Sequence, residues 1–343
     1  MRNSYIVLKL KLFLLACLKR KITLRKLWNV LVCSLAYVLK CKRSGRAPFI
    51  LSLELGNECN ANCLFCRDEK GVIHDTNKDK PAPGGITKGV MPFEMAEDII
   101  GQVSADVLIA VLYTNGEPLL YPKLADLIRH CTRSNVLSMI ATNGLLLTPE
   151  KSKAIVDAGI DFIKLQLSGF TQDIYHVQVR YGDVERLKEN IRNLVKIRDD
   201  QKSRTLIMLD YILYQYNQHQ LPLIREFCRE LGIMLSIRPG NPQGGLEDKE
   251  CPQSMQALPL KISCDWLWKG MQVNFNGHVL PCCDGVIFSA IAPYEIYQVG
   301  KSDVRTIWNG PAAQGMRHTM TVHGRGAIRL CSQCYRHGVA FKW

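Results

Sequence analysis

The stretch Cys59-Asn-Ala-Asn-Cys63-Leu-Phe-Cys66 places three thiols close together, at the spacing C-x3-C-x2-C. Three thiolates can hold three irons of a four-iron, four-sulfur cluster, and the fourth iron then takes a ligand from outside the protein. A closed structural site, such as a zinc site, usually has four protein ligands. The trio therefore predicts an iron–sulfur centre that does chemistry on a bound molecule. Structural zinc and buried free thiols are the alternatives.

The residues around the trio predict an α/β fold. The trio follows an apolar run at 49–54 that is typical of a buried strand. From there to about residue 240, strand-like runs alternate with helical patterns, which indicates a parallel sheet with crossover helices. The expected strands are 49–54, 107–113, 136–141, 161–167, 205–213 and 234–238, and the expected helices are 92–104, 122–133, 149–158, 184–199 and 219–231. Six such units are too few for a closed eight-stranded barrel.

With Phe65 as its aromatic residue, the trio resembles the C-x3-C-x-φ-C signature of radical S-adenosylmethionine (SAM) enzymes. The resemblance implies a partial (β/α)6 barrel and a [4Fe-4S] cluster whose open iron is chelated by the amino and carboxylate groups of SAM. It also implies that one electron from the reduced cluster cleaves SAM to methionine and a 5′-deoxyadenosyl radical, which takes a hydrogen atom from the substrate. A reductant such as flavodoxin or ferredoxin would supply the electron.

Two successive strands are expected to end in the same triplet, Thr-Asn-Gly, within 113–118 and 141–144. Sites in such folds lie at the carboxyl ends of the strands. Radical SAM enzymes usually have Gly-Gly-Glu-Pro after the second strand, in a loop that holds the SAM amine, and here Asn115-Gly116-Glu117-Pro118 stands in its place. By this resemblance the segment is expected to bind the amine, through Glu117 or a backbone carbonyl. Asn143 belongs to the second triplet and is a further candidate.

Other positions are expected to contact SAM. The fourth strand ends in Leu-Gln166-Leu-Ser168-Gly, where relatives often have Ser-x-Asp-Gly, so Gln166 and Ser168 are expected to bind the ribose or the carboxylate. Arg180 lies in a segment that resembles the family's Arg-Gly-containing helix-loop, and it is expected to pair with the SAM carboxylate in a bidentate way. A surface arginine is the alternative. Tyr211 and Asn217 are candidates for the adenosine pocket.

A second set of cysteines follows an irregular stretch rich in proline and glycine at 239–245. Cys264 and Cys282 have the spacing C-x12-G-x4-C, and Cys331-Ser-Gln-Cys334 follows later. Four such cysteines suit a fully ligated cluster or zinc. The pattern resembles the SPASM/twitch extension of radical SAM enzymes, in the short form that carries one auxiliary [4Fe-4S] cluster. Cys283 is the alternate to Cys282 as a ligand, and Asp284 is a candidate catalytic base.

The net charge of +13 is concentrated near the amino terminus, because residues 1–46 contain 12 basic residues and no acidic ones. This uneven distribution argues against a general nucleic-acid-binding protein. The same segment has apolar clusters that are too short for a membrane span, and we expect no export signal because Lys9 and Lys11 interrupt the first cluster. We expect two cationic amphipathic helices on the anionic inner face of a membrane. Two helices packed on the barrel are the alternative.

These patterns predict three parts: a basic helical segment at 1–48, a radical SAM partial barrel at 49–245 and a small SPASM/twitch-like domain at 250–343. Oxygen-labile clusters favour the cytoplasm. The expected function is oxidation of a small-molecule, sugar-like or lipid-linked substrate with the auxiliary cluster as electron acceptor, by resemblance to 2-deoxy-scyllo-inosamine dehydrogenase. The alternatives are a SPASM maturase that modifies peptides or proteins and a non-catalytic metal-binding protein.

Overall fold

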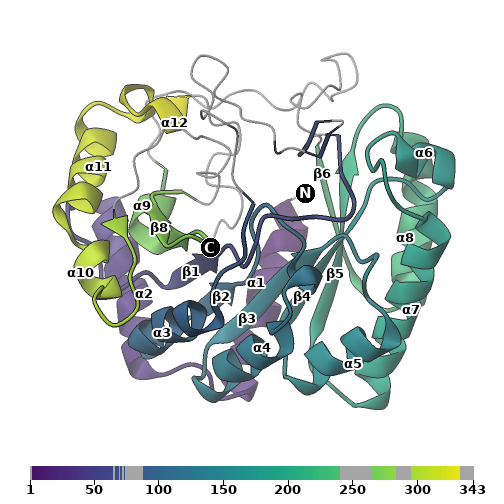
Figure 1. Ribbon diagram of the computed structural model, residues 1–343, viewed down its shortest axis with the longest axis horizontal. Helices are drawn as coiled ribbons and strands as arrows, with labels where there is room; N and C mark the ends of the chain where they lie inside the picture. Colours follow the sequence, from purple (N-terminus) through teal and green to yellow (C-terminus); the bar gives the residue numbers. More distant parts are fainter. Residues whose placement is uncertain are drawn as a thin grey trace.

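The strands of the described residues form one nine-stranded sheet with the order β6-β5-β4-β3-β2-β1-β7-β8-β9 (Figure 1). The computed structural model describes residues 2–64, 66–68, 70–71, 73, 88–239, 264–282 and 295–332. The strands are β1 (Ile50–Leu53), β2 (Ile109–Val111), β3 (Leu137–Thr142), β4 (Phe162–Leu167), β5 (Leu206–Leu213), β6 (Met234–Pro239), β7 (Gly270–Val273), β8 (His278–Leu280) and β9 (Glu295–Ile296). The first six are parallel to their neighbours. The predicted partial (β/α)6 barrel is therefore confirmed.

The helices of the described chain follow the predicted alternation closely. They are α1 (Arg2–Leu18), α2 (Leu24–Val38), α3 (Phe93–Val103), α4 (Leu124–Arg133), α5 (Pro149–Asp157), α6 (Gln172–His176), α7 (Val184–Asp200), α8 (Leu221–Glu230), α9 (Trp266–Lys269), α10 (Val304–Trp308), α11 (Pro311–Val322) and α12 (Arg329–Ser332). Short 3-10 turns lie at Pro118–Leu120, Gln218–Gln220 and Arg325–Ala327. Each of α5 and α7 begins where a side chain caps it, with Thr148 and Asp183 accepting from the first turn.

Both faces of the parallel sheet are covered, which is why its strands are almost continuously apolar. Alternate residues such as Leu51, Ala110 and Leu209 belong to the core that includes side chains of α3, α4, α5, α7 and α8. The residues between them, such as Ile50 and Phe162, belong to a second core. This second core is closed by α1, so α1 lies on the opposite face of the sheet from α3 and α4 (Figure 1).

The C-terminal segment extends the barrel sheet, which the sequence patterns did not predict. Strand β7 runs parallel to β1, with Leu51 opposite Met271, and β8 then returns antiparallel to β7. The Gln272 side chain of β7 donates to Thr114 Oγ1 in the loop after β2, over 3.0 Å. The residues expected to form the auxiliary domain are thus attached directly to the strand that precedes the cysteine trio.

Some basic residues of the first 46 positions form ion pairs with buried carboxylates of the barrel. Lys19 and Lys21 each place Nζ 2.7 Å from a carboxylate oxygen of Asp161, which is fully buried at the start of β4. Arg25 makes a bidentate pair with Asp106, also fully buried. The alternative that α1 and α2 pack on the barrel is therefore correct for one face of each helix. None of the described helices has the length and apolar character needed to cross a bilayer.

Candidate functional site

The cysteine trio lies in the loop after β1, at the carboxyl edge of the sheet. The Cys63 carbonyl accepts from the Cys66 and Arg67 amides, both over 2.9 Å, so the second half of the trio forms one helix-like turn. The backbone of Cys63 also forms an antiparallel β-bridge with Val179, and the Leu64 amide donates to the Gln178 carbonyl over 2.8 Å. The loop between α6 and α7 therefore holds the trio from the side. Phe65 lies outside the described residues.

The electrostatics of the trio show that its thiols are close neighbours. Burial raises the pKa of the Cys63 thiol well above its usual value, and the nearby thiols of Cys66 and Cys59 raise it further. Ligation to iron deprotonates a thiol outright and would relieve this penalty. Within the described ranges, no three His, Cys, Asp or Glu side chains converge on the position of a single metal ion. A four-iron cluster takes one thiolate per iron and needs no such convergence.

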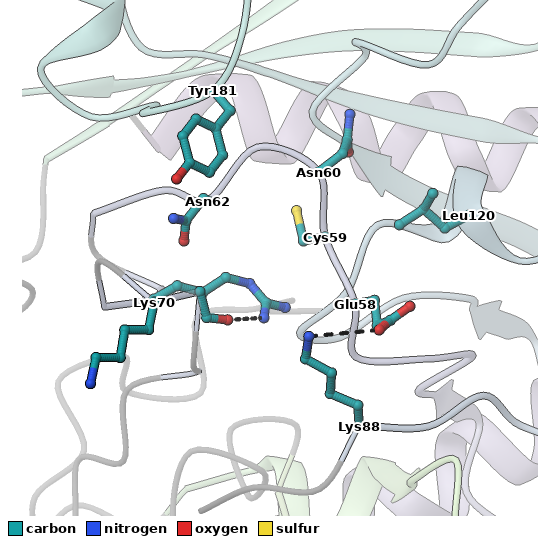
Figure 2. A pocket seen from close by; sticks show the side chains of 10 residues that line it. Glu58, Cys59, Asn60, Asn62, Lys70, Lys88, Leu120 and Tyr181 are labelled. Carbon is teal, nitrogen blue, oxygen red and sulfur yellow. Dashed lines mark hydrogen bonds and ion pairs between the residues drawn. The ribbon is translucent and has the colours of Figure 1, made fainter.

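A pocket of about 370 Å³ opens beside the first cysteine. Figure 2 shows Cys59 in the middle of its lining side chains, with Asn60 and Asn62 from the same loop and Tyr181 from the α6–α7 loop. The pocket is also lined by Glu58, Arg67, Lys70, Gly71, Lys88 and Leu120. Its size is within the usual range of small-ligand sites. A ligand bound there would lie next to Cys59.

Glu117 joins the two Thr-Asn-Gly loops. Its carboxylate accepts from Thr142 Oγ1 over 2.6 Å, from the Asn143 amide over 2.9 Å and from the Leu119 amide over 3.0 Å. Three protein donors thus bind this buried carboxylate and give it a structural role. Binding of the SAM amine, through Glu117 or a backbone carbonyl of the segment, stays a prediction. These contacts account for Thr142 and Asn143 of the second triplet.

Gly116 lets the β2 loop touch the cysteine loop. A Cβ atom at this position would lie 2.2 Å from the Gly56 carbonyl oxygen and 2.9 Å from that of Glu58. The next amide, that of Glu117, donates to the Glu58 carbonyl over 2.8 Å. A side chain would therefore force two backbone segments apart, with no flexible group to move aside.

We expect Gly116→Ala to lower the free energy of unfolding by about 3 kcal/mol, by the overpacking and strain that a Cβ introduces there. Gly101→Ala is the matched control, because a Cβ at Gly101 meets nothing within 4 Å and the residue lies inside α3. The control should be neutral or more stable by up to about 1 kcal/mol. Denaturant unfolding of both variants measures the difference, and equal stabilities would refute the close approach.

Arg67 is a site residue that the sequence patterns did not single out. Its buried guanidinium donates through Nη2 to the carbonyls of Asn57, over 2.5 Å, and Asn115, over 3.1 Å, and through Nη1 to that of Gly71, over 2.9 Å. It therefore connects the cysteine loop to the loop after β2, and it is one of the residues that line the pocket. Only its position directly after Cys66 marks it in the sequence, and its partners are distant backbone atoms.

Arg180, in the loop between α6 and α7, contacts the cysteine loop, and one of its nitrogens has a structural role there. Nη1 donates to the carbonyls of Arg67 and Asp68, over 2.9 and 2.7 Å. Asn143 also lies beside the trio, with Nδ2 3.6 Å from Cys59 Sγ and 2.9 Å from Asn60 Oδ1. The structure thus brings the expected residues Asn143 and Arg180 to the cysteine loop.

Several polar atoms near the strand ends are buried without a protein hydrogen bond. Within the described chain these include Gln166 Nε2, Ser168 Oγ, Asn62 Oδ1 and both amide atoms of Gln178. Buried polar groups are nearly always paired in native proteins. A polar molecule bound at this edge would satisfy them, and SAM has the amine, carboxylate and hydroxyl groups to do so. The residues present therefore fit a SAM site, and Gln178 is a candidate that sequence reasoning missed.

The face of the sheet that α1 covers changes along β5 from the apolar Met208 to the charged Asp210. Asp210 is fully buried on β5 and pairs with Arg238 Nε, over 2.7 Å, and Lys164 Nζ, over 3.0 Å. Burial alone would raise the pKa of Asp210, but Arg238 and Lys164 outweigh it and lower the pKa to about 2. This charged group lies one strand away from Gln166, which is opposite Asp210 in the β4–β5 register.

The carboxyl group of Glu54 gives the site a pH dependence. Burial raises the pKa of Glu54 to about 6, and the hydrogen bond from Asn115 offsets this only in part. Between the ordinary value of 4.5 and about 6, the folded protein therefore holds a proton that the unfolded chain releases. The free energy of unfolding must fall as the pH rises through this window, because the folded state binds more protons.

We expect Glu54→Gln to remove this effect, which corresponds to about 2 kcal/mol. The variant should unfold with a higher free energy than the wild type at about pH 7.5, and this advantage should shrink toward about pH 5. Denaturant unfolding at the two pH values is the measurement. A wild-type protein that is more stable at both values would contradict the raised pKa.

Three of the four predicted auxiliary cysteines come together in the structure. Cys264 precedes α9, Cys282 follows β8 and Cys331 lies in α12, and all three pack against one apolar cluster that includes Trp268 and Ile328. Burial raises the pKa of the Cys264 thiol well above its usual value, and the neighbouring Cys282 and Cys331 contribute. Donors gathered from three separate elements suit a ligated cluster. Cys334, Cys283 and Asp284 lie outside the described residues.

Two expectations about single residues were wrong. Tyr211 is fully buried in the helix-covered core and donates to the Asn217 carbonyl over 2.8 Å. Asn217 in turn bonds the backbone of Ser168 and Ile212. Both side chains stabilise the turn after β5 and do not line the pocket. Of the cysteines outside the two sets, Cys33, Cys131 and Cys228 are buried, whereas Cys17 and Cys41 are exposed.

Comparison with protein families agrees with these two cysteine sets. The family model described as the radical SAM superfamily matches residues 53–215, and the model described as an iron–sulfur cluster-binding domain, SPASM, matches residues 264–335. Together they cover most of the chain, including the pocket, the loops after β1, β2 and β3, and the auxiliary cysteines.

Curated relatives match mainly the barrel. The probable GTP 3′,8-cyclase of Methanocaldococcus jannaschii is 28% identical over 195 residues, which are 56% of this chain and 59% of that protein. The AdoMet-dependent heme synthase of Methanosarcina barkeri is 27% identical over 189 residues, 55% of this chain and 49% of that protein. The chain thus spans less than two thirds of the length of the curated relatives named here.

Solved structures share the fold over more of the chain. SuiB of Streptococcus suis, bound to the precursor peptide SuiA, superposes with a TM-score of 0.62 over 83% of this chain and 70% of its own, at 14% identity. BtrN in complex with AdoMet and 2-DOIA gives 0.51 over 83% and 92%, at 18% identity. The cysteine trio at the pocket, the auxiliary cysteines and both family matches lead to one conclusion. The chain belongs to the radical SAM superfamily and carries a SPASM-type iron–sulfur domain, so its cofactors are SAM and [4Fe-4S] clusters.

Proposed function

We propose that this enzyme cleaves SAM reductively and oxidises a small-molecule, sugar-like or lipid-linked substrate by two electrons, with one auxiliary cluster as electron acceptor. The observation that carries the proposal is the presence of two separate cysteine sets, next to segments whose strands β1 and β7 pair in one sheet. One set is a trio beside an open pocket, and the other is gathered in an apolar cluster next to the β7–β8 hairpin.

The residues at the pocket would hold SAM and the first cluster. Cys59, Cys63 and Cys66 would ligate the cluster, which when bound supplies the electron that cleaves SAM. The backbone at Asn115 and Gly116 would receive the amine, with Pro118 and Glu117 fixing that loop. We assign the ribose and carboxylate to Gln166, Ser168 and the remaining nitrogens of Arg180. Their buried or half-buried positions would exclude water from the bound ligand.

The second electron requires the auxiliary set. After a hydrogen atom leaves the substrate carbon, the substrate radical would lose one more electron and one proton to become the oxidised product. We assign the electron to the site formed by Cys264, Cys282, Cys331 and Cys334. Asp284, with Cys283 beside it, remains a proposed base. The product would then be oxidised by two electrons for each SAM consumed.

The setting of the reaction is also part of the proposal. Radical SAM enzymes need a reductant, and we propose a flavodoxin or ferredoxin, with the enzyme in the cytoplasm on the inner face of the membrane. Large apolar side chains exposed on α1 and α2 support the membrane location. A lipid-linked substrate would be presented at that surface.

A second candidate function is peptide modification. The structural match to SuiB, which was solved with a precursor peptide, favours it. The sequence match to GTP 3′,8-cyclases adds nucleotides as a third substrate class. In each case the first step on SAM would be the same, so the substrate distinguishes the candidates.

A substrate panel tests the proposal. Anaerobically reconstituted enzyme with dithionite and SAM is given 2-deoxy-scyllo-inosamine, a polyprenyl-linked sugar, GTP or a mixture of ribosomally made peptides. Stimulation of 5′-deoxyadenosine formation by a sugar-like compound, with a product two electrons more oxidised and SAM consumed irreversibly, is expected. Stimulation by GTP or peptide alone, or regeneration of SAM, would refute the proposed reaction.

A further inference from the structure

The helix α2 buries polar side chains against the protein and exposes its large apolar side chains. Its buried positions are Lys26, Asn29, Cys33 and Ala36. Its outer face carries the large apolar side chains, which are Leu24, Leu27, Trp28, Leu31, Leu35 and Val38. Leu24 is 87% exposed, Trp28 64% and Val38 68%. An ordinary surface helix buries its apolar stripe, so the outer stripe of α2 serves a contact that the described fold does not make.

The polar inner face of α2 is specifically bonded, so the helix is held in this orientation. Lys26 Nζ donates to the Asn135 carbonyl over 2.5 Å. Asn29 Nδ2 donates to the carbonyls of Ala47 and Asp106, over 2.9 and 3.1 Å. Turning the helix to bury its leucines would break these buried bonds. The exposed stripe is therefore a fixed feature of the surface.

The neighbouring helix α1 has two apolar stripes. Leu8, Leu12 and Leu15 pack against the sheet. A second stripe faces outward and consists of Ile6, Val7, Leu10, Phe13, Leu14 and Leu18. With Leu39, the two helices hold 13 of the 21 large apolar side chains that are exposed in the described residues. Only five residues, 19–23, separate the helices.

We propose that the outward faces of α1 and α2 bind the surface of an anionic lipid bilayer. The charge around the stripes favours lipid as the occupant, because Lys11, Arg20, Lys42 and Arg43 are exposed and no acidic residue occurs before Glu54. Basic residues beside an apolar helix face attract anionic head groups. A second copy of the same face would bring two positive surfaces together. Tryptophan, here Trp28, prefers the water–lipid interface.

This inference rests on the proposed membrane location but not on the proposed reaction. The inner face of α2 also contacts the auxiliary site, because Ala36 packs in the same cluster as Cys264 and Cys282. Binding of α2 to a bilayer would therefore hold the enzyme by an element that is in direct contact with its auxiliary cysteines. Vesicle binding is measured without SAM or substrate, so its failure and a failure of the reaction are distinguishable.

The test is co-sedimentation of the full reconstituted chain with vesicles. Phosphatidylcholine vesicles that contain about a quarter phosphatidylglycerol should carry the protein down, and pure phosphatidylcholine should carry less, because the basic residues add attraction to anionic lipid. A Trp28→Glu, Leu31→Glu double variant should bind at least about tenfold more weakly, since it removes two inserted apolar side chains. Leu223→Glu, on α8, is the matched control because Leu223 is 47% exposed, as Leu31 is.

Thermal unfolding of both variants checks that they fold, and Trp28→Ser gives a milder change if the double variant does not. The proposal is overturned if the wild type binds neither kind of vesicle, or if the control variant loses as much vesicle binding as the double variant. It is also overturned if the wild type is a dimer in size-exclusion chromatography that the double variant converts to a monomer without any vesicle binding. Unchanged vesicle binding by a folded double variant would overturn it as well.

Discussion

Cys63→Ala is expected to abolish SAM cleavage while the auxiliary cluster remains. Cys63 is the central residue of the trio, its backbone forms the turn that carries Cys66, and its thiol is close to both other thiols. Two thiolates would not hold a four-iron cluster with one open iron in place. We expect 5′-deoxyadenosine formation to fall by at least about a thousandfold, since SAM would no longer be bound to a cluster that supplies the electron.

The iron content separates this result from simple unfolding. The wild type should hold about eight irons and the variant about four, as two and one four-iron clusters require. Cys131→Ala is the matched control, because Cys131 is also a buried thiol but lies in α4 and is distant from the loop in sequence. The control should keep both clusters and its activity. Cleavage that persists in Cys63→Ala would contradict the assignment of the trio.

Arg67→Met is the second change with a large expected effect. The guanidinium donates to three backbone carbonyls, and two of these belong to different loops of the site. Methionine fills similar space but leaves these carbonyls without a donor, at a cost of about 1–3 kcal/mol for each buried group. We expect the free energy of unfolding to fall by about 3 kcal/mol and the Kd for SAM to rise at least tenfold, by about 1.4 kcal/mol.

Arg225→Met is the control for this change, because Arg225 is exposed on α8. Equilibrium dialysis of SAM against each variant under anaerobic conditions measures the Kd, and denaturant unfolding measures stability. Arg67→Lys should recover little, because a single ammonium group does not reproduce the planar fork that reaches both loops. Wild-type affinity for SAM in Arg67→Met would show that the loops keep their positions without this side chain.

The fold could be predicted largely from local patterns. Each expected strand from 49–54 to 234–238 is present within a few residues, because buried parallel strands are continuous apolar runs that are easy to recognise. The pairing of β7 with β1 could not be predicted in this way. It joins residues about two hundred positions apart, and the run at 270–273 is too short to be distinctive.

The site was predictable where the chemistry lies in adjacent residues. The trio and the segment Asn115–Pro118 have fixed spacings. In the structure Cys59 lines the pocket, and the Glu117 amide donates to the carbonyl of Glu58, which also lines it. Arg67 was missed because its importance depends on carbonyls of two separate loops, and Gln178 because only the packed structure shows that its amide is buried without a partner. The structural role of Glu117 could not be predicted for the same reason. Its three donors belong to its own loop and to the next one, and no spacing in the sequence announces them.

The amino-terminal helices show the limit of amphipathic patterns. The apolar periodicity at 24–38 correctly predicted a helix, but periodicity does not say which face meets the protein. The buried face proved to be the one with Lys26 and Asn29, because these side chains find partners in the barrel loops. The structure confirms the barrel alternative for the inner face of both helices, and membrane contact of the outer face is our proposal.

The central claim is that the trio at the pocket makes this protein a SAM-cleaving enzyme. The most direct test is to purify the wild type without oxygen, measure iron, sulfide and zinc, and then add dithionite and SAM. We predict about eight irons and eight sulfides per chain and the formation of 5′-deoxyadenosine together with methionine. A protein that contains zinc alone, or one that is loaded with iron and sulfide but forms no 5′-deoxyadenosine after reduction, would contradict the claim.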